Sequence, residues 1–213
     1  MKKIYLLAGI LLFGSLWGFS EVLIGSTLHD AGLPTGAIMT GIFAISFLVL
    51  SRLIYRQPGM QFGIGLVAGG LRLFNPFVGC HLCSAIAIMA EGAIFEIIWY
   101  KLSPDFSELK NVIMQTSMGI ISAYFLYIGG YIVTQILTPI ASGANFYLEN
   151  LIVFLPNIFS SGLIAAVIGG AILPVTFLAK KIDISVKDRL YYPTTLGISL
   201  LCWFIVIGNW FLA

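Results

Sequence analysis

The stretch Asn75–Tyr100 reads NPFVGCHLCSAIAIMAEGAIFEIIWY, and it decides the fold class because it sets two carboxylates, Glu91 and Glu96, in a long apolar run. A helix of about 20 apolar residues crosses the hydrocarbon core of a bilayer. The whole chain of 213 residues has this character, with 59% hydrophobic and 9% charged residues, whereas soluble domains carry about 25% charged residues. The sequence therefore predicts an all-α, polytopic membrane protein.

The apolar segments predict a single transmembrane domain over residues 1–213, with six to seven helices in one bundle. The first segment follows Lys2 and Lys3, but no signal-peptide cleavage site follows it, so we expect a retained helix. The third segment is short and rich in glycine, which leaves open whether it crosses fully, tilts or is partly re-entrant. The expected helices are Ile4–Ile24, Ala37–Ile54, Met60–Phe74, Cys80–Tyr100, Val112–Ile140, Leu151–Ala179 and Tyr192–Leu212.

Basic residues predict the orientation of these helices. Ten of the eleven Lys and Arg residues fall on one side of a seven-helix arrangement, and only Arg72 falls near the other. Because basic residues gather in cytoplasmic loops, we expect a plasma (inner) membrane protein with a cytoplasmic N-terminus. Its net charge of +2 belongs to loop ends and gives no reason to expect nucleic-acid binding. The ten residues are Lys2, Lys3, Arg52, Arg56, Lys101, Lys110, Lys180, Lys181, Lys187 and Arg189.

Glu91 is the first candidate for a functional residue, because a carboxylate near the middle of a membrane helix is costly and usually functional. At about 100° per residue, Glu91 shares a face with Cys80, Ser84 and Ala87, and this small, partly polar face is expected to look into the bundle. Glu96 is rotated away from it. The alternative for either glutamate is a structural hydrogen bond to a neighbouring helix.

Further polar residues cluster at the expected outer ends of the helices. Glu21 follows Trp17 at the end of the first helix, and Arg72 is the opposite charge on the same side, so the two form an ion pair or both face a substrate. His29 and Asp30 fall in the expected first outer loop, GSTLHDAGLPTG. They are either a metal ligand with its supporting carboxylate or a solvated turn in which Asp30 caps.

Cys80, His81 and Cys83 form the most compact cluster of reactive side chains. Thiolates and imidazoles bind Zn, Ni, Co or Cu, and a C-x-x-C pair is also found in redox dithiols. A single pair is a weak signal, and membrane helices also use cysteine as a small packing residue. All three interpretations stay open, although three cysteines do not make a disulfide framework. The sequence has no nucleophile elbow, zinc-protease helix or phosphate-binding loop.

In layout the chain resembles the S components of energy-coupling factor (ECF) transporters, which are the substrate-binding membrane subunits of prokaryotic vitamin and metal importers. The resemblance rests on the runs GSLWGFSEVLIG, LHDAGLPTG and AIAIMAEGAIFEII and on the lack of a soluble domain. It implies six helices, a binding site near the outer face, and docking through small residues of the first helix, here Gly14 and Gly18. The chain departs from the pattern in these glycines, where alanine is usual, in a seventh helix, and in lacking an N-terminal histidine segment.

The resemblance makes a binding and transport subunit, and not an enzyme, the leading hypothesis. Its partners would be a transmembrane coupling subunit and the ATPase subunits of an ECF module, besides the bilayer and a small vitamin, cofactor precursor or transition metal. The alternatives are a thiol-disulfide oxidoreductase using Cys80 and Cys83, and a structural membrane protein. A cofactor is not identified, although a transition-metal ion is one candidate. The expected substrate residues are Trp17, Glu21, His29, Arg72 and Glu91, and the expected metal ligands are Cys80, His81 and Cys83.

Overall fold

The computed structural model describes residues 3–74, 80–102, 109–143, 148–179 and 188–212, and these are helical apart from short connections. The predicted all-α class is confirmed. Of the residues named above, Lys2, Asn75, Lys180, Lys181 and Lys187 lie outside the described ranges. The helices are α1 (Lys3–Asp30), α2 (Thr35–Met39), α3 (Ile45–Tyr55), α4 (Met60–Arg72), α5 (His81–Ile97), α6 (Val112–Ala141), α7 (Leu148–Ala179) and α8 (Asp188–Leu212), with π-helices η1 (Thr40–Ala44) and η2 (Ile98–Leu102).

Six helical segments in the described part of the chain are long and apolar enough to cross a membrane. The second of them joins α2, η1 and α3 into one helix over Thr35–Tyr55. The segment that falls short is α4, whose 13 residues span only about 20 Å at 1.5 Å per residue. It is the segment whose crossing was uncertain from the sequence, and most of it is buried, which is where a short membrane helix is tolerated.

The first helix is longer than expected, and the prediction that His29 and Asp30 lie in a loop is wrong. Both belong to the last turn of α1. The helix ends only where Gly32 adopts a left-handed conformation with φ of 69°. There the Leu33 amide donates to the Leu28 carbonyl at 3.1 Å and the Gly32 amide donates to the His29 carbonyl at 2.9 Å, which is the Schellman pattern. The helix was expected to end near Ile24 because about 20 residues suffice to cross the bilayer. Its end is set instead by the turn at Gly32.

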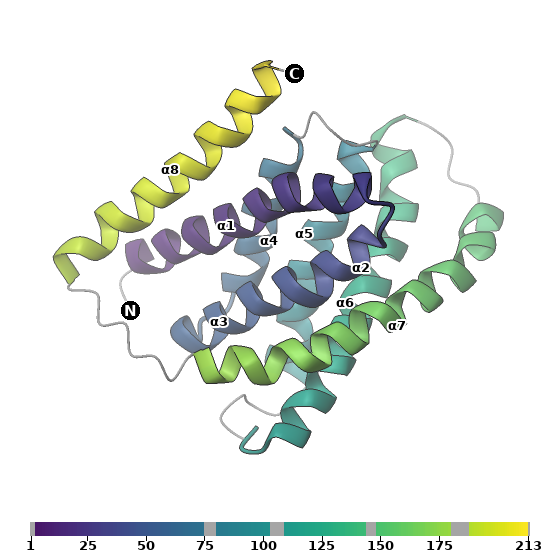
Figure 1. The fold of residues 1–213 in the computed structure, drawn as a ribbon, viewed down its shortest axis with the longest axis horizontal. Helices are drawn as coiled ribbons and strands as arrows, with labels where there is room; N and C mark the ends of the chain where they lie inside the picture. The colour runs from purple at the N-terminus through teal and green to yellow at the C-terminus, as the bar shows by residue number, and fades with distance from the viewer. Residues whose placement is uncertain (1–2, 75–79, 103–108, 144–147, 180–187, 213) are drawn as a thin grey trace.

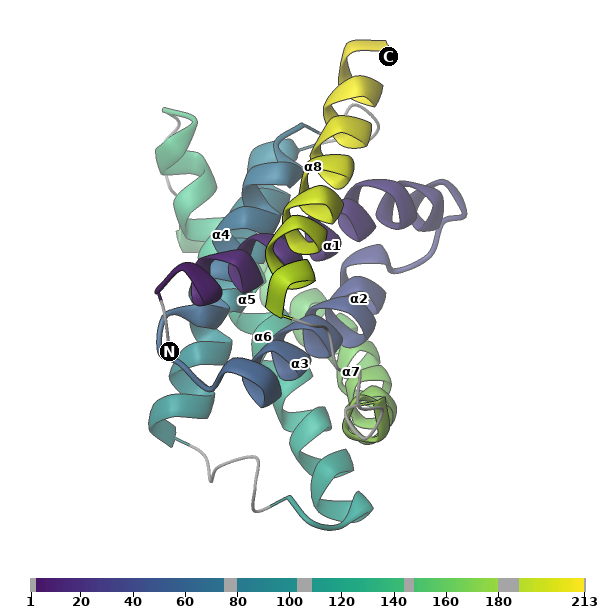
Figure 2. The ribbon, with the colours of Figure 1, turned by 90° about the vertical axis from the view of Figure 1, so that its left-hand side faces the viewer.

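The helices cross at steep angles instead of lying side by side. In Figure 1, α1, α3 and α7 run across the view while α4, α5 and α6 lie behind them. The quarter turn in Figure 2 shows α5 and α6 upright and α7 nearly end-on. The last helix, α8, lies along the outside of α1 (Figure 1), where the Trp203 indole donates to the Ser15 hydroxyl at 3.1 Å.

Glycines allow α4 to pack closely between α1 and α5. A Cβ built on Gly18 of α1 would lie 2.8 Å from the Ala68 carbonyl oxygen and from the Leu71 Cβ of α4. On the other side of α4, a Cβ on Gly92 of α5 would lie 2.7 Å from the Gln61 carbonyl oxygen. Close approach of this kind is the usual reason for small residues at membrane helix contacts, and it fixes α4 in the centre of the molecule.

These contacts correct the expectation that Gly14 and Gly18 form a docking surface. Both glycines are buried, and a Cβ on Gly14 would lie 2.6 Å from the Val67 Cβ of α4. The small residues of α1 therefore pack against α4 of the same chain. A partner helix would have to displace α4 to reach it, so we do not retain the two glycines as a docking surface.

Aromatic contacts mark the two ends of the bundle. At one end, the Tyr5 ring of α1 lies 5.2 Å from the Tyr55 ring of α3 and 4.5 Å from the Tyr191 ring of α8. At the other end, the Phe74 ring, just beyond α4, lies 5.8 Å from the Trp210 ring of α8. Helices α1 and α8 therefore run in the same direction, as expected if the chain changes sides at each of seven helical segments, α4 included.

The outer helices present apolar side chains to their surroundings. Val153 of α7 is 74% exposed and Phe204 of α8 is 76% exposed. A soluble protein rarely exposes so many large apolar groups, whereas hydrocarbon surrounds them at no cost. Together with the six apolar helices, this surface identifies a multi-pass membrane protein.

Candidate functional site

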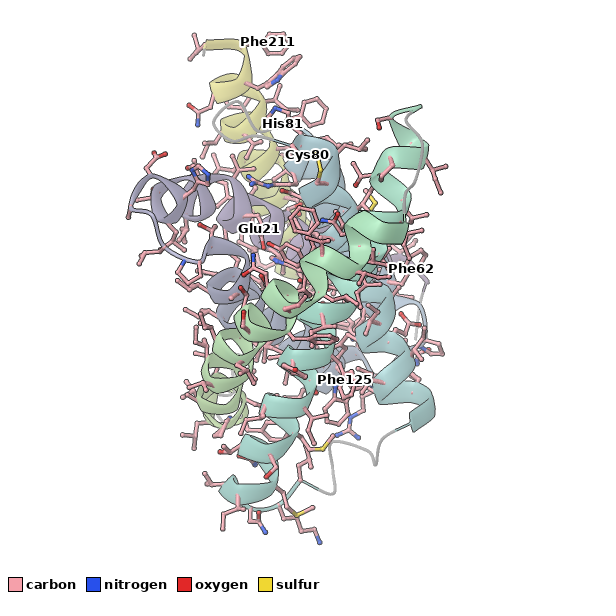
Figure 3. The ribbon with its side chains drawn as sticks, turned by 90° about the vertical axis from the view of Figure 1, so that its right-hand side faces the viewer. Glu21, Phe62, Cys80, His81, Phe125 and Phe211 are labelled. Carbon is pink, nitrogen blue, oxygen red and sulfur yellow. A yellow bond between two sulfur atoms is a disulfide. The ribbon has the colours of Figure 1, made fainter. Side chains whose placement is uncertain are left out.

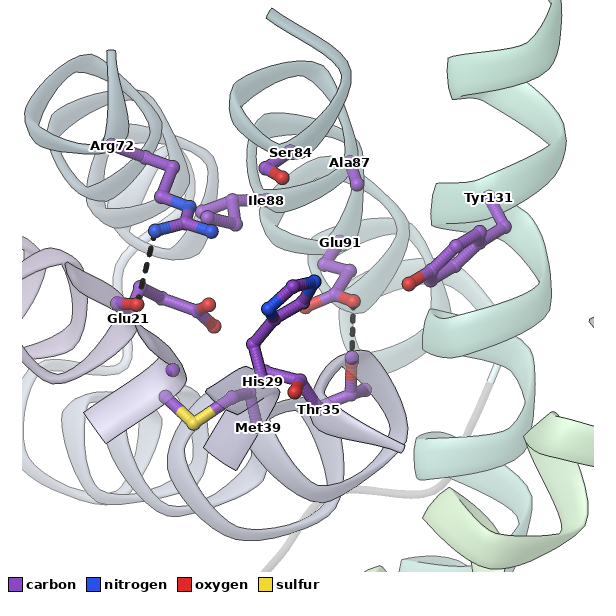
Figure 4. Close-up of a pocket in the computed structure, with 13 residues that line it drawn as sticks. Glu21, His29, Thr35, Met39, Arg72, Ser84, Ala87, Ile88, Glu91 and Tyr131 are labelled. Atoms are coloured by element: carbon purple, nitrogen blue, oxygen red, sulfur yellow. Dashed lines mark hydrogen bonds between the residues drawn. The ribbon is translucent and has the colours of Figure 1, made fainter. Parts of the chain in front are cut away.

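A cavity of about 190 Å³ lies between α1 and α2 on one side and α4, α5 and α6 on the other. It is the point where the steeply crossed helices leave space between them, and most of the side chains that line it are polar or small (Figure 4). Five separate segments of the chain contribute. The lining residues are Glu21, Gly25, His29, Thr35, Gly36, Met39, Thr40, Arg72, Ser84, Ala87, Ile88, Glu91 and Tyr131.

Glu91 enters the cavity from α5 together with Ser84 and Ala87, so three of the four residues expected on this face of the helix line the cavity, and Cys80 does not. Its side chain is 3% exposed. The Thr40 hydroxyl donates to Glu91 Oε1 at 2.6 Å. Thr40 is the first residue of the π-helix η1, and such local widening is frequent at functional sites. Here it interrupts the second span beside the membrane carboxylate.

Glu21 enters from α1 and is 8% exposed. The indole of Trp17, one turn earlier, donates to Glu21 Oε1 at 3.1 Å. Trp17 itself is fully buried and is not among the residues that line the cavity. The structure therefore gives Trp17 the role of orienting Glu21, and the expectation that it contacts a substrate directly is not met.

Arg72 ends α4 at the wall of the cavity and is 5% exposed. Its Nη1 donates to the backbone carbonyl of Glu21 at 3.2 Å (Figure 4). No nitrogen of Arg72 comes within the 4.0 Å that defines an ion pair with either carboxylate, among the residues that the structure describes. Its buried Nε also lacks a partner there. The ion-pair alternative is thus not what the structure contains, and both charges face the same space.

His29 and Tyr131 bound the cavity at two other points. The His29 side chain is 59% exposed, so the cavity reaches the molecular surface beside it. Its Nδ1 lies 3.9 Å from Asp30 Oδ1. Tyr131 of α6 points its hydroxyl toward the cavity in Figure 4, and a Cβ at Gly36 would overlap that hydroxyl. Glycine at position 36 therefore makes room for the tyrosine.

The cluster of Cys80, His81 and Cys83 lies apart from this cavity. Figure 3 shows Cys80 and His81 at the start of α5, below Phe211 and above Glu21 in the view. Cys80 and Cys83 form a disulfide, and none of the three lines the cavity. Within the described ranges, no three His, Cys, Asp or Glu side chains come together as a metal ion would require. The metal assignment stays a prediction that this geometry does not favour.

Glu96 has a different environment, one and a half turns further along α5. Its carboxylate accepts a hydrogen bond from the Phe62 amide at 2.9 Å and another from the Gly59 amide. Gly59 is the N-cap residue of α4 and Phe62 lies in its first turn, where backbone N–H groups lack helical partners and the helix dipole favours negative charge. Glu96 therefore makes structural hydrogen bonds to a neighbouring helix, which was the alternative to a functional role for this residue.

The structure places four of the five expected substrate residues, Glu21, His29, Arg72 and Glu91, in the lining of one cavity. Cys80, expected on the same face as Glu91, and Cys83 are absent from that lining. Thr40 and Tyr131 were not singled out from the sequence, because hydroxyl residues are common in membrane helices. The one available signal was that each is a polar side chain inside an apolar span.

No protein-family model matches this chain, and no curated protein or solved structure is significantly similar to it. The chemistry of the site therefore stands on the sequence and the geometry alone.

Proposed function

We propose that this protein is a substrate-binding membrane subunit of an importer of the ECF type. It would bind a small vitamin, cofactor precursor or transition metal near its outer face and pass it inward, and it would not be an enzyme. A transmembrane coupling subunit and ATPase subunits would supply the energy, because the sequence contains no phosphate-binding loop of its own.

The cavity is the observation that carries this proposal. It collects two carboxylates and a guanidinium, each at most 8% exposed, from α1, α4 and α5. Charged groups are expensive within a membrane protein unless they are paired or serve a ligand. Here the described residues provide no ion pair between them, and ligand sites are typically concave with a few convergent polar groups.

The proposal includes an orientation. With the N-terminus in the cytoplasm, the cavity end of α4 and α5 faces outward, which is where an importer must meet its substrate. The coupling subunit would then dock on a surface other than Gly14 and Gly18, since these contact α4.

Native mass spectrometry of the purified full chain tests the proposal by looking for a retained small molecule or metal ion. We expect a retained species that disappears in Glu91→Gln. Once it is identified, Glu91→Gln should weaken its binding more than Cys80→Ser does if it is organic, and less if it is a metal. A chain that carries no ligand, and binds none from a vitamin and metal panel, would contradict the proposal.

The second candidate, a thiol-disulfide oxidoreductase, has the Cys80–Cys83 disulfide in its favour. Cys80 is the N-cap of α5 and its sulfur accepts a hydrogen bond from the Cys83 amide at 3.1 Å. The remaining cysteine, Cys202, is buried in α8 and unpaired, so a second dithiol would have to come from a partner. Trapping of a mixed disulfide by Cys83→Ser in cells would support this candidate over the importer.

A further inference from the structure

We infer that the cavity selects a small organic monocation, such as a protonated amine, over neutral and anionic molecules of the same shape. The inference rests on the proposed function, because it names the chemical class of the substrate for the same site. It comes from the charges, the hydrogen bonds and the size of the cavity.

The charges that face the cavity do not balance. Glu21 and Glu91 each place a carboxylate in the lining of the cavity. Arg72 contributes one positive charge. When all three are ionised the site has one surplus negative charge, and a low-dielectric environment makes such a surplus costly. A ligand with a single positive charge removes it.

The hydrogen bonds leave acceptors facing the ligand space. One oxygen of each carboxylate is occupied, Glu21 Oε1 by Trp17 and Glu91 Oε1 by Thr40. Among the residues that the structure describes, no group donates a hydrogen bond to Oε2 of Glu21 or to Oε2 of Glu91. An ammonium group has several N–H donors and no acceptor, so it suits a space between two carboxylates. The partnerless Nε of the 5% exposed Arg72 offers one donor to an oxygen or ring nitrogen elsewhere on the ligand.

The size of the cavity favours an organic ligand over a bare ion. A dry cavity of about 150 Å³ accepts benzene, and this one measures about 190 Å³. A molecule of one ring, or an open chain of similar size, therefore fits. A desolvated metal ion would need several protein ligands in contact with it, and no such cluster is present among the described residues.

Two matched series of probes test the inference on the full chain in detergent at pH 7. One series is benzylamine, benzyl alcohol and benzoate, the other butylamine, butanol and butyrate, with Ni²⁺ and Co²⁺ alongside. We expect at least one amine to bind tenfold or more tightly than its neutral and anionic counterparts, as measured by calorimetric titration. Glu91→Gln and Glu21→Gln should each reduce that binding tenfold or more, because each removes a charge-assisted hydrogen bond, and a tenfold loss corresponds to only about 1.4 kcal/mol.

Glu96→Gln is the matched control, because it removes the same charge from the same helix outside the cavity. It should leave amine affinity unchanged within twofold. Thermal unfolding of each variant shows whether it is folded. If the Glu91→Gln protein is unfolded, the amine affinity of Glu21→Gln alone tests the inference. The inference is overturned if no amine is preferred, if the anion or a metal binds best, or if the preference survives both cavity variants. A retained neutral or anionic solute would overturn it while leaving the importer proposal standing; the absence of any ligand would overturn both.

Discussion

Two regions of the α4–α5 pair use the same kinds of residue for opposite purposes. In the first, Glu96 accepts hydrogen bonds from two amides at the start of α4, and the Arg52 guanidinium lies 3.5 Å from the centre of the Tyr100 ring. In the second, Glu91, about one and a half turns earlier in α5, faces a cavity together with Arg72, and only part of their hydrogen-bonding capacity is used inside the protein.

Burial does not separate a functional charge from a structural one in this comparison. Arg52 is 8% exposed and Arg72 is 5% exposed, and each has a buried nitrogen without a hydrogen-bond partner among the described residues. What differs is the surroundings. Arg52 lies over the Tyr100 ring, whereas Arg72 lines a cavity that also contains two carboxylates. Several polar groups that converge on one cavity indicate a ligand.

The largest effect is expected from a test of which end faces outward. A single cysteine replacing His29 should react with a membrane-impermeant maleimide in intact cells, whereas one replacing Lys187 or Lys110 should react only after lysis, because basic residues mark the cytoplasmic side. Labelling yields, measured against a fully denatured sample, give the result. Reaction of the Lys187 variant in intact cells would show that the cavity opens toward the cytoplasm.

A bulky side chain between α1 and α4 should damage the cavity end by moving Glu21 away from Arg72. Gly18→Leu forces a side chain against Ala68 and Leu71, and overpacking of this kind costs about 1–3 kcal/mol or more. We expect a clear fall in the thermal midpoint and in ligand retention. Gly197→Leu is the control, because nothing lies within 4 Å of a Cβ there. If both variants unfold at the same temperature, α1 and α4 are not in this close contact.

The Gly18 contact also shows what the sequence could and could not establish. Composition and apolar run lengths were enough for the helical membrane class, and the ends of α4, α6 and α7 fall within three residues of their predicted positions. The glycine stripe of α1 was visible as well. Its partner was not, because a small residue predicts close approach without saying which helix approaches.

The same limit applies to the site. The costs of burying charge singled out Glu21, Arg72 and Glu91 from sequence, and helical periodicity placed Glu91 with Ser84 and Ala87. Periodicity describes one helix at a time, so it placed Cys80 at the same pocket although the steep crossing of the helices leaves it outside. Thr40 and Tyr131 became visible only when separate helices were brought together.

An intermediate effect is expected when the two glutamates of α5 are neutralised in the absence of ligand. Glu96→Gln weakens two bonds to the start of α4 and should lower stability by about 1 kcal/mol, in the range of lost helix caps. Glu91→Gln removes an incompletely paired buried carboxylate and should leave stability equal or higher. Thermal or chemical unfolding of the ligand-free proteins distinguishes them. A larger loss for Glu91→Gln than for Glu96→Gln would reverse the assignment of structural and functional roles.

The smallest effect is expected for Thr40→Val, which keeps the shape of the side chain and removes only its hydroxyl. The hydroxyl donates to Glu91 Oε1 at 2.6 Å, and one such bond contributes about 1 kcal/mol. If its purpose is to orient Glu91 toward the ligand, the loss should appear as about a fivefold lower affinity for the bound cation. The unfolding midpoint should change little, because the freed carboxylate faces the cavity and can take up water there. Ser122→Ala supplies the comparison, since it removes a buried hydroxyl that does not line the cavity and should leave affinity unchanged. Equal affinities for Thr40→Val and the unmodified protein would mean that Glu91 is held by packing alone, and that the π-helix beside it has no part in binding.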